Sequence, residues 1–269
     1  MVRIVAALIA AVASAVAQGS SGVAQDAGLQ RSIDRGKLMY LYDRAAWVTS
    51  DDAIARIPAS RLEEVGGWVV TRTASGFHVD YFGKDAAADR VVYSADVNGG
   101  TVTNATVFAG TDEPTLKEPA LQMARALRAA RAEAARHADW RPCANAPFNT
   151  VVLQPQSDGI IPVYFLTPQT EMDSFPMGGH YEVDIAPNGT TAYTRSFTNA
   201  CLTMSKPPPS AGAAPAGVFV THILDPHPTE IHVFEQYYIG LPLFVGTGPK
   251  TVWKIEGGAV ENASPMIAK

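Results

Sequence analysis

Pairs of short segments with alternating apolar and polar residues, each pair joined by a tight-turn sequence, constrain this chain more than any other feature. Residues 90–97 and 101–108 flank Asn98-Gly99-Gly100, and Asn-Gly supplies the positive φ angles that a short hairpin turn requires. Two more hairpins are predicted, over residues 68–73 with 77–82 and residues 181–185 with 191–197. Because hairpins join antiparallel neighbours, the chain should build antiparallel sheets.

Further apolar segments predict additional strands over residues 37–42, 150–153, 160–166, 218–224, 241–245 and 251–255. Proline beside or within the segments at 150–153 and 160–166 predicts that both are edge strands. Residues 206–217 are rich in Pro, Ala, Gly and Ser, which indicates an exposed loop.

One long amphipathic helix is predicted over about residues 114–138. Apolar residues repeat there at steps of three and four from Leu116 to Ala134, after a capping Thr111 or Asp112. Four arginines lie off this stripe, and a solvated helix surface is favoured over an anion-binding face: Arg125, Arg128, Arg131 and Arg136. Two short helical pieces are expected after Asp43 and after Ser50. The predicted fold class is α+β, with mainly antiparallel sheets and the long helix between two β-rich halves.

The N-terminus has the pattern of a bacterial signal peptide. Arg3 precedes an unbroken apolar stretch over residues 4–13, and Ala15-Val16-Ala17 provides a small-x-small cleavage site. Cleavage after residue 24 is an alternative, and the apolar stretch is too short for a membrane span. The predicted organisation is a signal peptide at 1–17, a mobile segment at 18–30, an α+β half at 31–140 and a β-rich half at 141–262.

Cysteine usage and charge are consistent with a periplasmic or secreted protein. The two cysteines, Cys143 and Cys201, are most simply a disulfide in an oxidising compartment, with two reduced thiols as the rival interpretation. Removal of Arg3 with the leader moves the net charge from −5 to −6. An acidic surface repels phosphate backbones, so nucleic acid is not an expected partner.

The sequence contains no nucleophile elbow, phosphate-binding loop, His-Glu-x-x-His motif or dinucleotide-binding glycine pattern. The most conspicuous segment is residues 221–235, which holds three of the six histidines. Imidazole and carboxylate groups are the usual zinc ligands, and the candidate ligands are His222, Asp225, His227 and His232. Glu230 is the candidate general base for a metal-bound water. The alternative interpretation is a His-rich turn in which Thr229 caps a helix.

Residues 218–255 resemble the C-terminal part of the JAB/MPN (JAMM) metallopeptidase core. His222 takes the first histidine position of the His-x-His-Pro motif, and residues 229–232 take the position of Ser-x-x-Asp. Leu224 stands where the resemblance requires the second histidine, and His232 stands where it requires the aspartate. The resemblance therefore implies a family member that has lost or rebuilt its zinc site.

Three other polar groups are weaker candidates. His180, Glu182 and Asp184 share one face of a predicted strand, and His78 and Asp80 share a face of another. For both groups, a strand with one face exposed to solvent is the favoured interpretation. Arg195 and Asn199 precede Cys201 and are candidates for a polar pocket near the bridge.

Two functions follow from these observations. The first is a non-catalytic envelope or secreted protein that binds an unidentified protein or small molecule. The alternative is a metal-dependent envelope hydrolase that uses the cluster at residues 222–235, with zinc as its metal. The two differ in whether at least three of these side chains approach within metal-binding distance of one another.

Overall fold

The computed structural model describes residues 13–206 and 215–264, with side chains from Ala27 onward. Residues 1–12 of the predicted signal peptide and residues 207–214 of the predicted loop lie outside this part of the chain. The helices are α1 (Ala13–Arg56), α2 (Ala59–Leu62), α3 (Ala120–Ala134) and α4 (Glu230–Ile239), with short 3-10 turns at Asp85–Ala87 and Gly110–Asp112. No described helix is long and apolar enough to cross a membrane.

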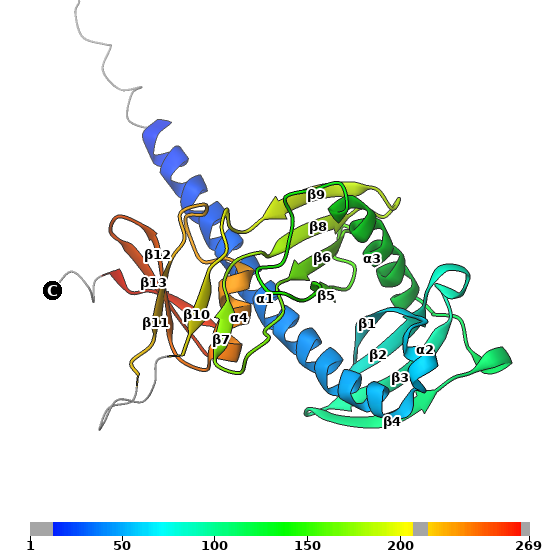
Figure 1. The fold of residues 1–269 in the computed structure, drawn as a ribbon. Coiled ribbons are helices and arrows are strands. Elements are labelled where there is room, and N and C mark those ends of the chain that lie inside the picture. Colours follow the sequence, from blue (N-terminus) through cyan, green and yellow to red (C-terminus); the bar gives the residue numbers. More distant parts are fainter. Residues whose placement is uncertain (1–12, 207–214, 265–269) are drawn as a thin grey trace, which may run out of the picture.

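The first sheet is a four-stranded antiparallel meander that packs on α1 (Figure 1). Its strands are β1 (Val65–Thr73), β2 (Gly76–Gly83), β3 (Val91–Asn98) and β4 (Thr101–Val107). Asn98 pairs with Thr101, and Gly99 and Gly100 both have the positive φ that the turn needs. Both predicted hairpins of this region are confirmed.

The second sheet is antiparallel in the order β5-β6-β8-β9 and packs against α3. Its strands are β5 (Asn149–Val152), β6 (Ile161–Leu166), β8 (Tyr181–Ile185) and β9 (Thr191–Ser196). The hairpin at 181–197 is confirmed, and β5 is the expected edge strand. The edge prediction for β6 is wrong, because β6 pairs with both β5 and β8. Pro162 is tolerated there, and its carbonyl accepts a hydrogen bond from the Leu153 amide.

The third sheet packs against α4 and contains the one parallel pair among the described strands. Its order is β11-β12-β13-β14, with β11 (Val218–Thr221), β12 (Leu243–Gly248), β13 (Thr251–Glu256) and β14 (Ala259–Asn262). The strands β7 (Ser174–Pro176) and β10 (Thr203–Ser205) form a separate two-stranded ribbon. The α+β class with mainly antiparallel sheets is therefore confirmed.

The longest helix is α1, which the sequence interpretation divided into other elements. Residues 18–30, expected to be mobile, and residues 37–42, expected to be a strand, belong to α1. Asp43 and Ser50 do not begin new helices, because both lie inside it. Residues at helical spacing along it are buried from Met39 through Tyr42, Ala46 and Thr49 to Ala53. That stripe packs on the first sheet, where the Tyr81 hydroxyl donates to the Ala46 carbonyl at 3.0 Å.

The helix predicted at about 114–138 is α3, and it is shorter than expected. It begins at Ala120, with Pro119 as its N-cap, and a 3-10 turn at Gly110–Asp112 precedes it. It contacts strands of both the first and the second sheet, as expected for a helix that joins two β-rich regions. One large apolar core spans α1, α3 and these two sheets, and a smaller core lies between α4 and the third sheet.

Close contact between α1 and α4 determines the position of the candidate site. At Gly36 an added Cβ would lie 2.6 Å from both the Glu230 carbonyl oxygen and Val233 Cβ. Only a residue without a side chain permits this approach. Further along the same pair of helices, Tyr40 stacks on Tyr237 with ring centroids 4.7 Å apart.

Candidate functional site

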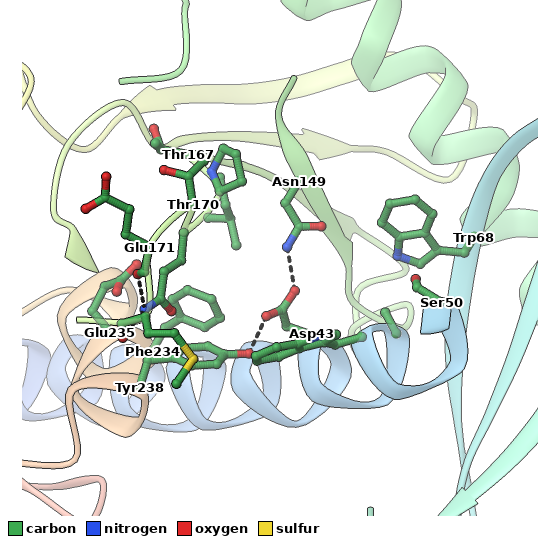
Figure 2. Close-up of a pocket in the computed structure, with 16 residues that line it drawn as sticks. Asp43, Ser50, Trp68, Asn149, Thr167, Thr170, Glu171, Phe234, Glu235 and Tyr238 are labelled. Carbon is green, nitrogen blue, oxygen red and sulfur yellow. Dashed lines mark hydrogen bonds between the residues drawn. The ribbon is translucent and has the colours of Figure 1, made fainter. Parts of the chain in front are cut away.

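A pocket of about 530 Å³ lies where α1, α4, β5 and the loop after β6 meet (Figure 2). This volume suits a small organic ligand. The lining residues come from five separate parts of the chain: Asp43, Ala46, Trp47 and Ser50; Trp68; Asn149; residues 166–172; and Phe234, Glu235 and Tyr238.

Asp43 of α1 carries the hydrogen-bonded carboxyl group of the pocket. It accepts a hydrogen bond from the Tyr238 hydroxyl and one from Asn149 Nδ2, the latter at 2.5 Å, as Figure 2 shows. Burial raises the pKa of Asp43, although these two hydrogen bonds oppose the shift. Asp43 thus joins α1, α4 and β5 at one point.

Glu235 of α4 carries the second carboxyl group, and its surroundings differ. The residue is 3% exposed, and no hydrogen bond joins its carboxyl group to another described residue. The nearest basic atom is His180 Nε2, 4.0 Å from Glu235 Oε1. Burial, with the Asp43 charge as a second cause, raises the pKa of Glu235 well above its usual value. Burial thus shifts the titration of Glu235 in favour of the protonated form.

The walls of the pocket are aromatic. Phe234 and Tyr238 meet edge to face with ring centroids 5.3 Å apart, and Trp47 lies tilted beside Tyr238 at 6.5 Å. Trp68 closes the side near the first sheet. Trp47 and Met172 are 48% and 88% exposed, so apolar side chains also form the rim.

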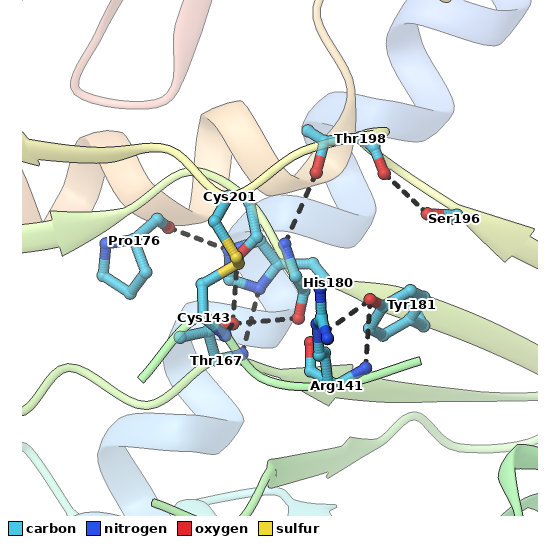
Figure 3. The surroundings of a disulfide bond; sticks show 11 residues. Arg141, Cys143, Thr167, Pro176, His180, Tyr181, Ser196, Thr198 and Cys201 are labelled. Carbon is cyan, nitrogen blue, oxygen red and sulfur yellow. Dashed lines mark hydrogen bonds between the residues drawn. A yellow bond between two sulfur atoms is a disulfide. The ribbon is translucent and has the colours of Figure 1, made fainter. Parts of the chain in front are cut away.

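The predicted disulfide between Cys143 and Cys201 is confirmed, and Figure 3 shows its surroundings, which include the lining residue Thr167. The Cys143 amide donates to Thr167 Oγ1 at 3.0 Å, and the Thr167 amide donates to His180 Nδ1 at 3.3 Å. His180 Nε2 in turn donates to the Pro176 carbonyl at 2.8 Å. Burial lowers the pKa of His180 to about 4, so this histidine is neutral. The disulfide therefore fixes the position of Thr167, which lines the pocket. Through Thr167 it also positions His180, the histidine nearest Glu235.

A second buried polar cluster lies between α1, α4 and the second sheet. Arg35 Nη1 donates to Glu182 Oε1 at 2.5 Å and to the Tyr164 hydroxyl oxygen at 3.2 Å. The Tyr164 hydroxyl lies 3.1 Å from Glu182 Oε1 and from Glu230 Oε1, and Ser32 Oγ lies 3.5 Å from Glu230 Oε2. Burial, followed by the neighbouring Glu230, raises the pKa of Glu182 to about 8. We call Ser32, Arg35, Tyr164, Glu182 and Glu230 the Arg35 cluster.

The His-rich segment brings three of the four predicted ligands near one another, because the rings of His222 and His232 meet edge to face with centroids 4.7 Å apart and His222 pairs with Asp225. His222 Nε2 lies 2.6 Å from Asp225 Oδ2, which also pairs with Arg195 at 2.5 Å. His227 Nδ1 instead donates to the Pro228 carbonyl at 3.0 Å. Within residues 13–206 and 215–264, no three His, Cys, Asp or Glu side chains are placed to hold a metal ion.

His232 and Glu230 have structural partners of their own. Thr229 caps α4, and His232 Nδ1 accepts from the Thr229 amide at 3.0 Å in a capping box. Burial lowers the pKa of His232 to about 3, so it stays neutral. Glu230 points into the Arg35 cluster and not toward the histidines. The capping interpretation of Thr229 thus matches this geometry.

The weaker candidates have separate positions. His180 and Glu182 are fully or almost fully buried, so the half-solvated interpretation of β8 is wrong for them. Asn199 is exposed and lines none of the main cavities described. His78 lies between Asp80 and Asp96, at 3.2 and 2.7 Å, beside a cavity of about 310 Å³ on the other face of the first sheet. These aspartates raise the pKa of His78 to about 9.

Comparison of the chain with family models, with curated proteins and with solved structures found no match. The resemblance of residues 218–255 to the JAMM core stays a prediction.

Sequence reasoning did not nominate the residues of the pocket. Asp43 was interpreted as a helix cap, and Glu235 only as the end of the His-rich segment. A signal for Glu235 existed, because α4 places Glu and Gln among Ile, Val and Phe with no polar face. A helix of that pattern is buried on all sides, which forces its acidic residues inside.

Proposed function

We propose that this protein is exported from a bacterial cytoplasm and acts as a non-catalytic binding protein for a small molecule. The pocket between α1 and α4 carries this proposal, because it combines a ligand-sized volume, aromatic walls, the buried carboxyl group of Glu235 and the half-buried one of Asp43. The alternative, a zinc hydrolase, has less support: His222, Asp225 and His232 lie near one another, but no three His, Cys, Asp or Glu side chains among the described residues are placed to hold a metal ion.

Export is supported by the leader-like N-terminus and by the disulfide, a bond typical of oxidising compartments. Expression of the full chain in a bacterial host tests it. Mass spectrometry of the periplasmic fraction and of the medium should find a chain that begins at Gln18 with Cys143 and Cys201 joined. An intact Met1 in the cytosol with both thiols free would contradict export.

Ligand binding can be tested without knowledge of the ligand. A set of neutral, cationic and anionic aromatic fragments is screened by ligand-observed NMR against the mature protein. The Thr170→Trp variant, which adds a large side chain to the exposed pocket wall, should lose the hits. Thr101→Trp, on the exposed end of β4, is the matched control and should retain them. Hits that survive Thr170→Trp, or a complete lack of hits, would contradict a binding function at this pocket.

A further inference from the structure

The charged side chains that line the pocket, among the described residues, are all acidic. Three carboxyl groups line it, those of Asp43, Glu171 and Glu235. None of the described lining residues is Lys, Arg or His. Arg44 lies over the Trp47 ring, with its guanidinium carbon 4.4 Å from the ring centroid, and does not line the cavity. An anionic ligand would therefore meet repulsion and no cationic partner.

Glu235 presents to the cavity a carboxyl group that no described residue hydrogen bonds. That carboxyl group is buried. His180 Nε2, the nearest basic atom at 4.0 Å, already bonds the Pro176 carbonyl. Buried polar groups without partners are costly, and in native proteins they commonly mark a functional site.

The same pair of helices shows how this chain compensates buried carboxyl groups elsewhere. Glu182 and Glu230 share the Arg35 guanidinium, which lies 2.5 and 3.9 Å from them. No described basic side chain occupies the corresponding position between Asp43 and Glu235. A cation in the pocket would complete the arrangement.

The aromatic walls suit the rest of such a ligand. Trp47, Trp68, Phe234 and Tyr238 present apolar surface around the carboxyl groups. Aromatic faces attract an ammonium group as well as an apolar body.

We propose that the pocket binds a small organic cation, with its ammonium group between Asp43 and Glu235 and its apolar part against the aromatic walls. This inference rests on the proposed binding function and names its ligand class.

Three compounds with one ring system and different charge test the inference: tryptamine, the neutral alcohol tryptophol and the anion indole-3-acetate. Calorimetry on the disulfide-bonded mature protein should show tryptamine binding at least about tenfold more tightly than tryptophol, because a charge-assisted hydrogen bond contributes that much. Indole-3-acetate should bind most weakly. Benzyltrimethylammonium, a cation of different shape, should also bind.

Substitutions of single carboxyl groups test which of them causes the preference for tryptamine over tryptophol. Glu235→Gln should bring tryptamine and tryptophol to similar affinities, and Asp43→Asn is the second variant in case the first does not fold. Glu63→Gln, at an exposed position outside the pocket, is the matched control and should keep the preference. Equal affinities for the amine and the alcohol in wild type, or no binding of either cation, would overturn the inference. Neutral fragment hits that Thr170→Trp abolishes would still support the proposed binding function in that case.

Discussion

The Arg35 cluster and the pocket are two acidic regions on the same pair of helices, and they differ in how their carboxyl groups are compensated. In the Arg35 cluster the chain supplies the cation, a tyrosine hydroxyl and a serine hydroxyl. In the pocket Asp43 has two hydrogen-bond donors, but Glu235 has none among the described residues and faces a cavity. In the first arrangement the chain itself supplies the charge partner of both carboxyl groups, although Arg35 Nε has no hydrogen-bond partner among the described residues. The second lacks a partner, which is what a binding site requires.

The largest effect should come from loss of the guanidinium group in the Arg35 cluster. Arg35→Met leaves Glu182 and Glu230 buried without their charge partner, and we expect it to lower the free energy of unfolding by about 3–5 kcal/mol. Urea denaturation measures it. Arg31→Met, at an exposed position of the same helix, should change stability by less than about 0.5 kcal/mol. A similar small change for both variants would mean that the Arg35 cluster is not a structural ion pair.

The disulfide should matter more to the pocket than to the Arg35 cluster. Replacement of Cys143 and Cys201 by alanine opens a loop with a sequence separation of 58 residues, for which the loss is up to roughly 4 kcal/mol. Hydrogen exchange should rise at the Thr167 and His180 amides while the amides of α1 around Arg35 stay protected. An equal rise in hydrogen exchange in the pocket and in the Arg35 cluster would contradict this prediction.

The helix contact that positions both regions can be altered by one methyl group. Gly36→Ala would place Cβ 2.6 Å from backbone oxygen of α4, and we expect a loss of about 1–3 kcal/mol. Gly28→Ala is the matched control in the same helix, since its Cβ would meet only the His227 ring at 3.0 Å. That ring can move, so a gain of up to about 1 kcal/mol in helix propensity remains. Equal thermal stability of the two variants would contradict the close α1–α4 approach.

The smallest effect is a difference in pH dependence. The pKa of Glu235 is raised in the folded state, so the folded protein holds a proton that the unfolded chain releases above its ordinary pKa. Wild-type stability should therefore fall as pH rises above about 4.5, the usual value for a glutamate. Glu235→Gln should flatten this slope and be relatively more stable at the higher pH, measured by denaturation between pH 5 and pH 8. Parallel pH profiles for wild type and variant would show that Glu235 is not buried as described.

The hairpins were predictable from the sequence because their information is local. Asn-Gly turns and period-two alternation specify both the turn and the face of each strand, and the pairings at 98–101 and 181–196 follow. The helix α1 was misinterpreted because residues 37–42 form an apolar and aromatic run that is too short to separate a buried strand from a helix. The repeat that continues from Met39 to Ala53 was the better guide.

The pocket was not predictable in the same way. Asp43, Asn149 and Glu235 are far apart in the sequence, and only packing of α1 against α4 and β5 brings them together. The histidines attracted attention because they cluster in sequence, yet His227 and His232 bond backbone groups of their own turn. Proximity in sequence was thus a poor guide to which polar groups share a site.

The most direct test of the central claim is the proton balance when tryptamine binds. Calorimetry in buffers of different ionisation enthalpy, at constant neutral pH, reports how many protons the complex gains or loses. If an ammonium group takes its place beside Glu235, the carboxyl group ionises, and wild type should release protons that the Glu235→Gln variant does not. Binding without proton release in wild type, or with equal release in both proteins, would contradict the account.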